Sequence, residues 1–214
     1  MLLIGMLDSP FVRRVAISMR MHGLAYEHGN WSVGRDFERI RQYSPLGRVP
    51  VLVLDDRSVL IESAAILDYL DQQVGVTRAL LPVDGPQRRQ CLQIMAIAIG
   101  AAESARDAIY ERLMRPADKL HQPWLDRRLS QAAGALAELE VLALAAALRL
   151  PEWMVGNHMT QADITLACCY TFIADALPLA PETPYTALRT HVARCEELPE
   201  FLATRVPWFA PGKS

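Results

Sequence analysis

The stretch SPLGRVPVLVLDDRSVLIESAAILDYLD, residues 44–71, decides how the first part of the chain folds. Val51–Leu54 and Ser58–Ile61 are short apolar runs, and the polar residues 55–57 between them favour an antiparallel hairpin. After the second run the apolar period changes from strand-like to helical. Four residues then share one helical face: Ile66, Leu67, Leu70 and Val74. The stretch therefore predicts a loop, a β-hairpin and an amphipathic helix, in that order.

The residues before this stretch add two strands and two helices. A run of apolar residues over Leu2–Leu7 predicts a buried strand, and Ser9-Pro10 has the pattern of a helix start, with Ser9 as N-cap. A second strand over Tyr26–Trp31 and a short charged helix over Asp36–Tyr43 follow. The predicted order is βαβ and then αββα, a thioredoxin-like α/β domain.

The remaining residues predict a second domain built only from helices. Residues 76–85 are rich in turn formers, so we expect domains over 1–75 and 86–214 with a linker at 76–85. Prolines bound the predicted helical stretches, and Pro151 is expected to stop the second. The stretches are Pro86–Arg115, Pro123–Arg149, Ile164–Leu177, Tyr185–Leu198 and Pro199–Arg205.

Thr160 and Asp163 have the spacing of a capping box at the start of the Ile164–Leu177 helix. Each side chain of such a box bonds the backbone N–H of the other residue, and Met159 can pack on Ile164. The helix is apolar nearly all round, which predicts a buried position in the bundle. We expect a folding role, not a chemical one, for this pair.

Composition excludes several classes of function. The chain has 214 residues and a net charge of −2, so no general attraction to nucleic acid or an anionic membrane is expected. Arginine pairs such as Arg13-Arg14 are read as solvated helix faces. The four cysteines and five histidines show no metal-ligand spacing. The first residues lack signal-peptide features, and the apolar window Val141–Leu148 is too short to span a bilayer. We expect a soluble, cytoplasmic protein without a metal.

The layout resembles that of the cytosolic, bacterial-type glutathione S-transferases. The residues that carry the resemblance are Ser9-Pro10, Val49-Pro50, Glu62-Ser63 and the box Thr160-Gln161-Ala162-Asp163. The resemblance covers the whole chain. It implies a homodimeric detoxification enzyme that binds glutathione as co-substrate and transfers it to a small, hydrophobic electrophile.

Val49-Pro50 and Glu62-Ser63 are the expected glutathione-binding residues. In the family, the residue before a cis-proline pairs its main chain with the cysteine of glutathione, as an added strand would. The N–H groups at a helix start hold a carboxylate well, so Ser63 can bind the γ-glutamyl carboxylate while Glu62 faces the ammonium group. The alternatives are a trans proline that starts an edge strand and a Ser63 that serves as an ordinary N-cap.

Ser9 occupies the position of the family's catalytic residue. Lowering a thiol pKa from about 8.5 by two units requires about 2.7 kcal/mol of preference for the thiolate. A hydroxyl donor and a positive helix start, at about 1–2 kcal/mol each, supply that amount. The alternative is that Ser9 only caps its helix, and some bacterial members depend little on this serine.

The resemblance suggests further contacts. Phe11 is expected to wall the site, and Arg48 or Arg35 to reach the glycyl carboxylate of glutathione. Arg13 or Arg14 opposes the helix dipole, which hints at an anionic ligand, although surface charge is the simpler reading. The second substrate is expected between the domains. Its candidate wall shares one helical face: Arg106, Tyr110, Leu113 and Met114.

The sequence leaves two other functions open. A glutathione-dependent peroxidase or disulfide reductase would use the same ligand residues. A non-catalytic binding or regulatory module with this architecture is the second alternative, although such modules tend to lose the acid-serine pair. The sequence keeps Glu62-Ser63, which favours the enzyme.

Overall fold

The computed structural model describes residues 1–149, 153–177 and 185–209, and the chain folds into two compact units. The first consists of Met1–Val83 together with Glu197–Val206, and the second is built on Asp84–Glu196. Residues 197–206, expected in the C-terminal domain, group with the N-terminal unit in the structure. The expected stop at Pro151 lies outside the described residues.

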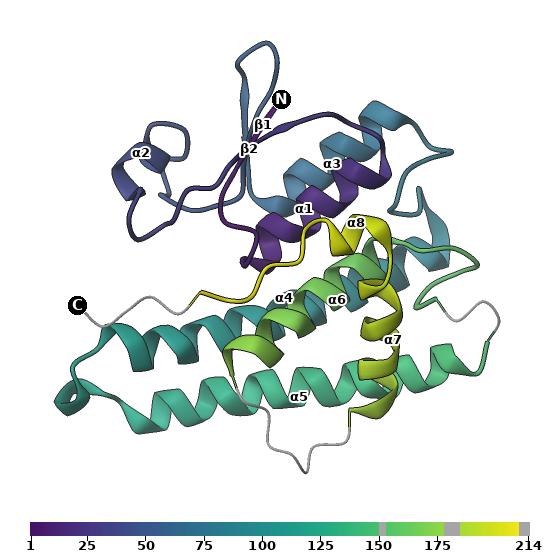
Figure 1. Cartoon of the computed structure of the whole chain (residues 1–214). Coiled ribbons are helices and arrows are strands. Elements are labelled where there is room, and N and C mark those ends of the chain that lie inside the picture. The colour runs from purple at the N-terminus through teal and green to yellow at the C-terminus, as the bar shows by residue number, and fades with distance from the viewer. Residues whose placement is uncertain (150–152, 178–184, 210–214) are drawn as a thin grey trace. The chain divides into compact units, whose positions relative to one another are not determined.

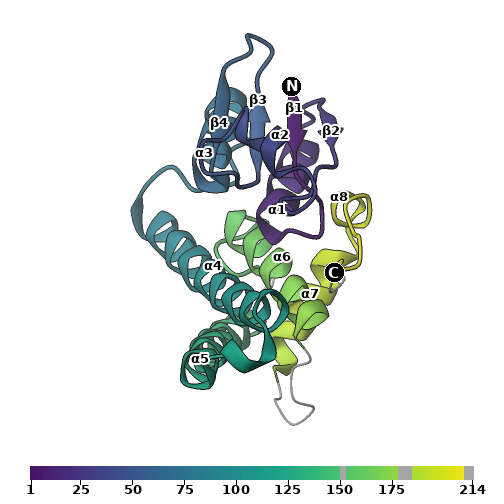
Figure 2. The ribbon, with the colours of Figure 1, turned by 90° about the vertical axis from the view of Figure 1, so that its left-hand side faces the viewer.

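The first unit contains one four-stranded mixed sheet in the order β2-β1-β3-β4. β1 (Leu2–Ile4) pairs in parallel with β2 (Glu27–Gly29) and antiparallel to β3 (Val51–Val53). β3 and β4 (Val59–Ile61) form the expected antiparallel hairpin. Figure 2 shows the strands in this order. Together with the helices of this unit, the sheet confirms the predicted thioredoxin-like βαβαββα domain.

Each strand is shorter than its apolar run suggests, and Gly5 shows why β1 ends early. Gly5 has a φ of +133°, and a Cβ built there would lie 2.5 Å from Val12 Cγ2 and 2.8 Å from Val49 Cβ. Only glycine fits this crowded, left-handed position. The chain therefore turns out of the sheet at Gly5, between the first helix and the loop before β3.

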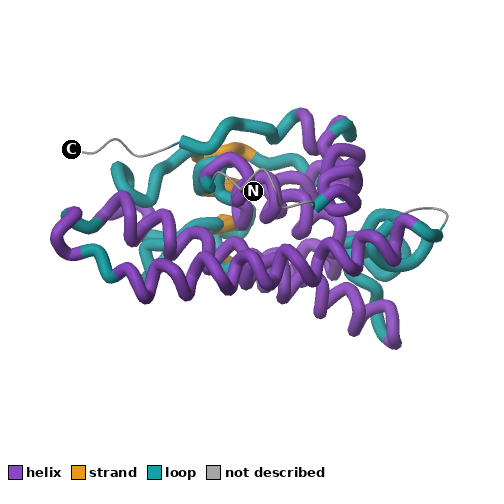
Figure 3. Tube along the Cα trace, turned by 90° about the horizontal axis from the view of Figure 1, so that it is seen from below, coloured by secondary structure: helices purple, strands orange, loops and turns teal. Residues whose placement is uncertain are grey.

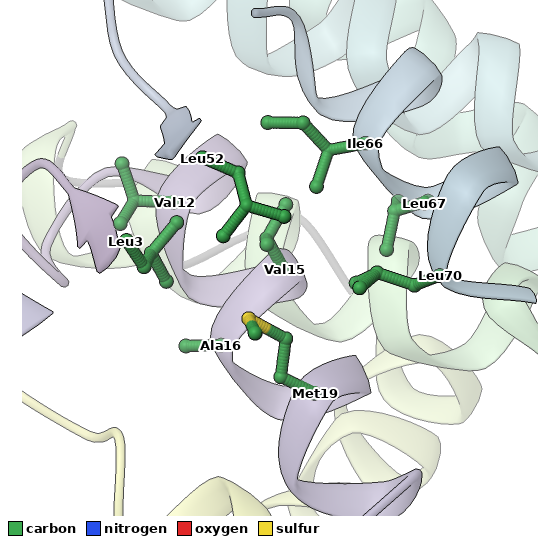
Figure 4. Packing of buried hydrophobic residues seen from close by; sticks show 9 residues of the cluster. All are labelled: Leu3, Val12, Val15, Ala16, Met19, Leu52, Ile66, Leu67 and Leu70. Atoms are coloured by element: carbon green, nitrogen blue, oxygen red, sulfur yellow. The ribbon is translucent and has the colours of Figure 1, made fainter. Parts of the chain in front are cut away.

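Helices cover both faces of the sheet, and alternate residues of β1 and β3 supply the two cores. Leu3 and Leu52 point to the face covered by α1 (Pro10–Met21) and α3 (Ser63–Val74), which lie side by side (Figure 1). Apolar side chains of α1 and α3 meet there (Figure 4). Ile4 and Val51 pack on the other face with Ile40. Ile40 belongs to α2 (Phe37–Arg41). The short α8 (Pro199–Leu202) contacts α1.

Among the described residues of the second unit, all regular secondary structure is helical, and loops join the helices (Figure 3). α4 contacts α5 and α6, and α7 contacts both α5 and α6. The elements are α4 (Gly85–Met114), the short 3-10 helix η1 (Ala117–Lys119), α5 (Gln122–Ala147), α6 (Gln161–Ala176) and α7 (Thr186–Glu196). By length and composition alone α5 could cross a membrane, so its apolar stretch is longer than the expected window Val141–Leu148. Its contacts with α4 and α7 make it a core helix of the bundle.

The predicted capping box at the start of α6 is present. Asp163 Oδ2 accepts hydrogen bonds from the Thr160 N–H at 2.8 Å and from its hydroxyl at 2.9 Å. Asp163 Oδ1 accepts the Met154 N–H at 2.9 Å and lies 3.1 Å from His191 Nε2 on α7. Asp163 is fully buried. It therefore ties three segments of the bundle together, which is the folding role expected of it.

Candidate functional site

Ser9 lies directly before the first residue of α1, at the end of the loop that follows β1. Ser9 has extended backbone angles, φ −71° and ψ 123°, and Pro10 is the first helical residue, so the predicted boundary is correct. The Ser9 side chain makes no capping hydrogen bond, and the residue is half-buried. Ser9 is thus the N-cap by position only, and capping does not use its hydroxyl.

The peptide bond between Val49 and Pro50 is cis, as the resemblance implies, and not the trans edge-strand alternative. Val49 is half-buried and packs against both cores of the unit, while Pro50 is buried. The close approach at Gly5 joins Val49 to Val12 of α1. The loop before β3 and the first turn of α1 are therefore neighbours.

The start of α3 does not match the alternative in which Ser63 is an ordinary N-cap. Glu62, not Ser63, occupies the N-cap position, and Ser63 is the first helical residue. Glu62 has a φ of +69°, and its side chain makes no capping bond. Glu62 is exposed, whereas Ser63 is only 2% exposed. The unpaired N–H groups of this first helical turn remain suited to an anion.

A buried arginine joins α1 to the start of α3. Arg14 is 1% exposed, and its Nη2 donates to Ser63 Oγ over 2.7 Å. The neighbouring Arg13, 3% exposed, donates from Nη2 to the Phe201 carbonyl at 3.1 Å. The reading of this pair as solvated surface charge was wrong, because both arginines are buried. They lie in a helix segment, Val12–Met19, whose residues are all buried.

The far ends of α1 and α3 are joined by a second polar contact. His22 Nε2 lies 3.1 Å from Asp71 Oδ1, and both residues are buried. Asp71 also accepts the N–H groups of Leu80 and Leu81, each at 2.9 Å. Sequence reasoning noted Arg13 or Arg14 as a cation that opposes the helix dipole, but it missed the bond from Arg14 to Ser63 and the His22–Asp71 contact. A signal for Arg14 exists, since two cations stand within a run of apolar helix residues, but none distinguishes His22.

The other candidates near glutathione occupy less constrained positions. Phe11 is half-buried beside Ser9, and Arg48 is exposed in the loop before Val49. Arg35 donates to Asp36 Oδ2 from Nη2 at 3.1 Å. The Ser32 N–H and this arginine hold the pKa of the Asp36 carboxyl below its ordinary value. Arg35 is thus engaged within its own loop, and Arg48 is the more accessible of the two cations.

The candidates for the second-substrate wall all lie in the last turns of α4. Tyr110 and Met114 are exposed, and Leu113 is half-buried. Arg106 donates to its neighbour Asp107, with Nη2 to Oδ1 at 3.0 Å. The structure confirms their common helix, and their role in binding stays a prediction.

Comparison with known proteins agrees with this architecture. The family model for the glutathione S-transferase N-terminal domain matches residues 3–78, and the model for the C-terminal domain matches residues 118–199. The chain is 27% identical over 173 residues to the uncharacterized GST-like protein YibF of Escherichia coli (strain K12), covering 81% of this chain and 82% of that protein.

Two solved structures are similar over nearly the whole chain. A glutathione transferase family member from Pseudomonas fluorescens Pf-5, with bound glutathione, is 30% identical with a TM-score of 0.83, covering 97% of this chain and 99% of that one. A glutathione S-transferase from Methylobacterium radiotolerans, in complex with glutathione sulfonate, is 25% identical with a TM-score of 0.89, covering 100% and 97%. The protein belongs to the glutathione S-transferase family.

Proposed function

We propose that this protein is a glutathione transferase that ionises the glutathione thiol and directs it at a small hydrophobic electrophile. The observation that carries the proposal is the Ser9 hydroxyl, which stands at the start of α1 and is not used for capping. A hydroxyl in that position can donate to a thiolate sulfur. The α1 dipole adds a second favourable interaction with the negative charge.

Glutathione would lie extended along the first unit. Its cysteine backbone pairs with the main chain of Val49, next to the cis peptide bond. Its γ-glutamyl carboxylate meets the N–H groups and the Ser63 hydroxyl at the start of α3, and Glu62 faces the ammonium group. Phe11 lines the site and Arg48 reaches the glycyl carboxylate. The glutathione bound to the Pseudomonas fluorescens relative and the glutathione sulfonate bound to the Methylobacterium radiotolerans relative support this ligand.

In the chemical step, the thiolate sulfur forms a bond to an electrophilic carbon while the bond from that carbon to a leaving group breaks. With an aryl halide, the halide ion leaves and no oxidant or metal is required. The substrate would contact the α4 face that carries Arg106, Tyr110, Leu113 and Met114. We further propose a cytoplasmic homodimer, as the resemblance implies.

A substrate panel tests the proposal. The protein is assayed with glutathione against aryl halides, epoxides, peroxides and mixed disulfides, alongside Ser9→Ala and a control variant, Ser58→Ala, in the exposed hairpin turn. We expect conjugation by the parent and by Ser58→Ala. Ser9→Ala should bind glutathione normally but raise the pKa of the bound thiol by roughly one to two units, read by ultraviolet absorbance of the thiolate.

Other outcomes would redirect the assignment. Turnover of peroxides or mixed disulfides alone would establish the reductase alternative. Glutathione binding without turnover of any substrate class would favour a binding module. An unchanged thiol pKa in Ser9→Ala would remove Ser9 from the chemistry and leave it an N-cap by position.

A further inference from the structure

We propose that Arg14 is a positioning residue for glutathione, acting through Ser63. Its buried guanidinium turns the Ser63 hydroxyl into a donor aimed at the γ-glutamyl carboxylate. The inference rests on the proposed function, because it assumes that glutathione is the ligand. It assigns a role to a residue of α1 that the ligand itself need not touch.

The direction of the hydrogen bond follows from chemistry alone. A guanidinium group has five N–H donors and no acceptor, so Ser63 Oγ must accept the 2.7 Å bond from Arg14 Nη2. The hydroxyl hydrogen of Ser63 then points away from Arg14. Among the residues that the structure describes, this hydrogen has no protein acceptor. An incoming carboxylate can accept it, and donation to a charged acceptor is stronger than donation to a neutral one.

The charge of Arg14 also fits an anionic ligand. The residue lies in the first turns of α1, where the helix dipole disfavours a cation, and burial disfavours it further. A carboxylate bound at Ser63 offsets both effects through its attraction to the guanidinium. Because the bond to Ser63 Oγ is buried and short, the ligand's charge is felt across one hydroxyl group with little screening by water.

Arg13 provides a matched control within the same helix. It is adjacent in sequence and equally charged, and it is buried to a similar degree, 3% exposed against 1% for Arg14. Arg13 contacts Phe201 of α8: Nη2 donates to the Phe201 carbonyl at 3.1 Å, and Cζ lies 5.7 Å from the centre of the Phe201 ring. Both arginines therefore stabilise the unit, but only Arg14 contacts Ser63 Oγ.

The test measures affinities by calorimetry for Arg14→Met, Arg13→Met, Ser63→Ala and the Arg14→Met/Ser63→Ala double variant. Two ligands are compared: glutathione and γ-aminobutyryl-cysteinyl-glycine, which lacks only the γ-glutamyl carboxylate. We expect Arg14→Met to weaken glutathione binding at least about tenfold, the range for hydrogen bonds to charged groups. Binding of the analogue should not change. In the double variant, adding Arg14→Met to Ser63→Ala should lower the affinity for glutathione little further than Ser63→Ala alone.

Thermal unfolding separates positioning from folding. Arg13→Met and Arg14→Met should both lower the melting temperature, yet Arg13→Met should leave the ratio of the two affinities unchanged. Should Arg14→Met not fold, Arg14→Lys replaces it, because lysine keeps the charge and a donor but not the planar fork. Its loss of affinity must then be confined to glutathione.

Three results would overturn the inference. Equal losses in Arg13→Met and Arg14→Met would assign Arg14 a purely structural role. Equal losses for glutathione and the analogue would show that Arg14 does not act on the carboxylate. An unchanged affinity in Ser63→Ala would show that this nearly buried hydroxyl does not reach the ligand. These three results would leave the proposed function intact. If the parent protein itself bound no glutathione, the proposed function would fail together with the inference about Arg14.

Discussion

At the residue scale, Glu62 is one of two non-glycine positions among the described residues that depart from ordinary backbone preferences. Its φ is +69°, a value rarely adopted by residues with a side chain, and Arg57 in the hairpin turn, at +71°, is the other non-glycine case among the described residues. Such conformations cost on the order of 1–3 kcal/mol and gather at functional sites. A glycine would avoid that cost, so the strained backbone at Glu62 supports the proposal that its carboxylate binds glutathione.

Replacing Glu62 by glycine should separate stability from binding. We expect Glu62→Gly to leave the free energy of unfolding unchanged or to raise it, by up to about 1–3 kcal/mol, while glutathione affinity falls. Urea denaturation and calorimetry measure the two quantities. Arg57→Gly is the matched control, with the same expected effect on stability and none on affinity. A destabilised Glu62→Gly with normal affinity would refute this role for the carboxylate.

Sequence reasoning located the residues whose signal is local and missed those whose signal is tertiary. The helix start at Ser9 and the box at Asp163 follow from short motifs, and the cis bond at Pro50 follows from the family resemblance that such motifs carry. The burial of Arg14 does not, because only the packing of α1 against α3 decides which side of the helix is covered. Short motifs also do not tell that Glu62, and not Ser63, occupies the N-cap position of α3, since that depends on the backbone angles of Glu62.

At the element scale, the fold order was predictable and the element ends were not. Apolar period distinguishes strand from helix, but β1 ends at Ile4 although the apolar run continues to Leu7. The reason is the contact of Gly5 with Val12 and Val49, residues distant in sequence. No local pattern reports such a contact. The same crowding keeps the first turn of α1 next to the loop before β3.

Substituting Gly5 by alanine should therefore be costly. The new Cβ would meet Val12 and Val49 at less than 3.0 Å in a left-handed backbone, so we expect a loss of about 1–3 kcal/mol of stability or more. Gly100→Ala, in the interior of α4 with nothing within 4 Å, should instead gain about 0.5–1 kcal/mol. Denaturant titration of both variants measures whether the free energy of unfolding falls in Gly5→Ala and rises in Gly100→Ala. A neutral Gly5→Ala would mean that the two segments separate easily.

At the scale of the whole molecule, buried groups that resist ionisation determine how the stability of the fold changes at alkaline pH. Burial raises the pKa of Cys195 above its ordinary 9.0, and the nearby Asp163 carboxylate raises it further. Burial likewise raises the pKa of Tyr170 and Tyr185. In each case the folded protein holds a proton that the unfolded chain loses first. Stability is then complete below the unfolded pKa and declines as the pH rises above it.

We accordingly expect the free energy of unfolding to fall above about pH 9, the ordinary thiol value. Cys195→Ala should make the onset of this decline less steep, whereas Cys91→Ala, a buried thiol on α4, is the comparison for the loss of side-chain volume. Urea titrations from pH 7 to 10 provide the data. If the free energy of unfolding fell equally steeply with pH in the parent and in Cys195→Ala, the Cys195 thiol would not contribute to the decline.

The account as a whole depends on glutathione being the ligand of the first unit, and calorimetric titration of the intact protein with glutathione tests that directly. Measured at two temperatures, so that a vanishing enthalpy at one of them cannot hide binding, it should show saturable heat with one site per chain. Ser63→Ala should weaken that binding. Absence of heat at both temperatures would contradict the account.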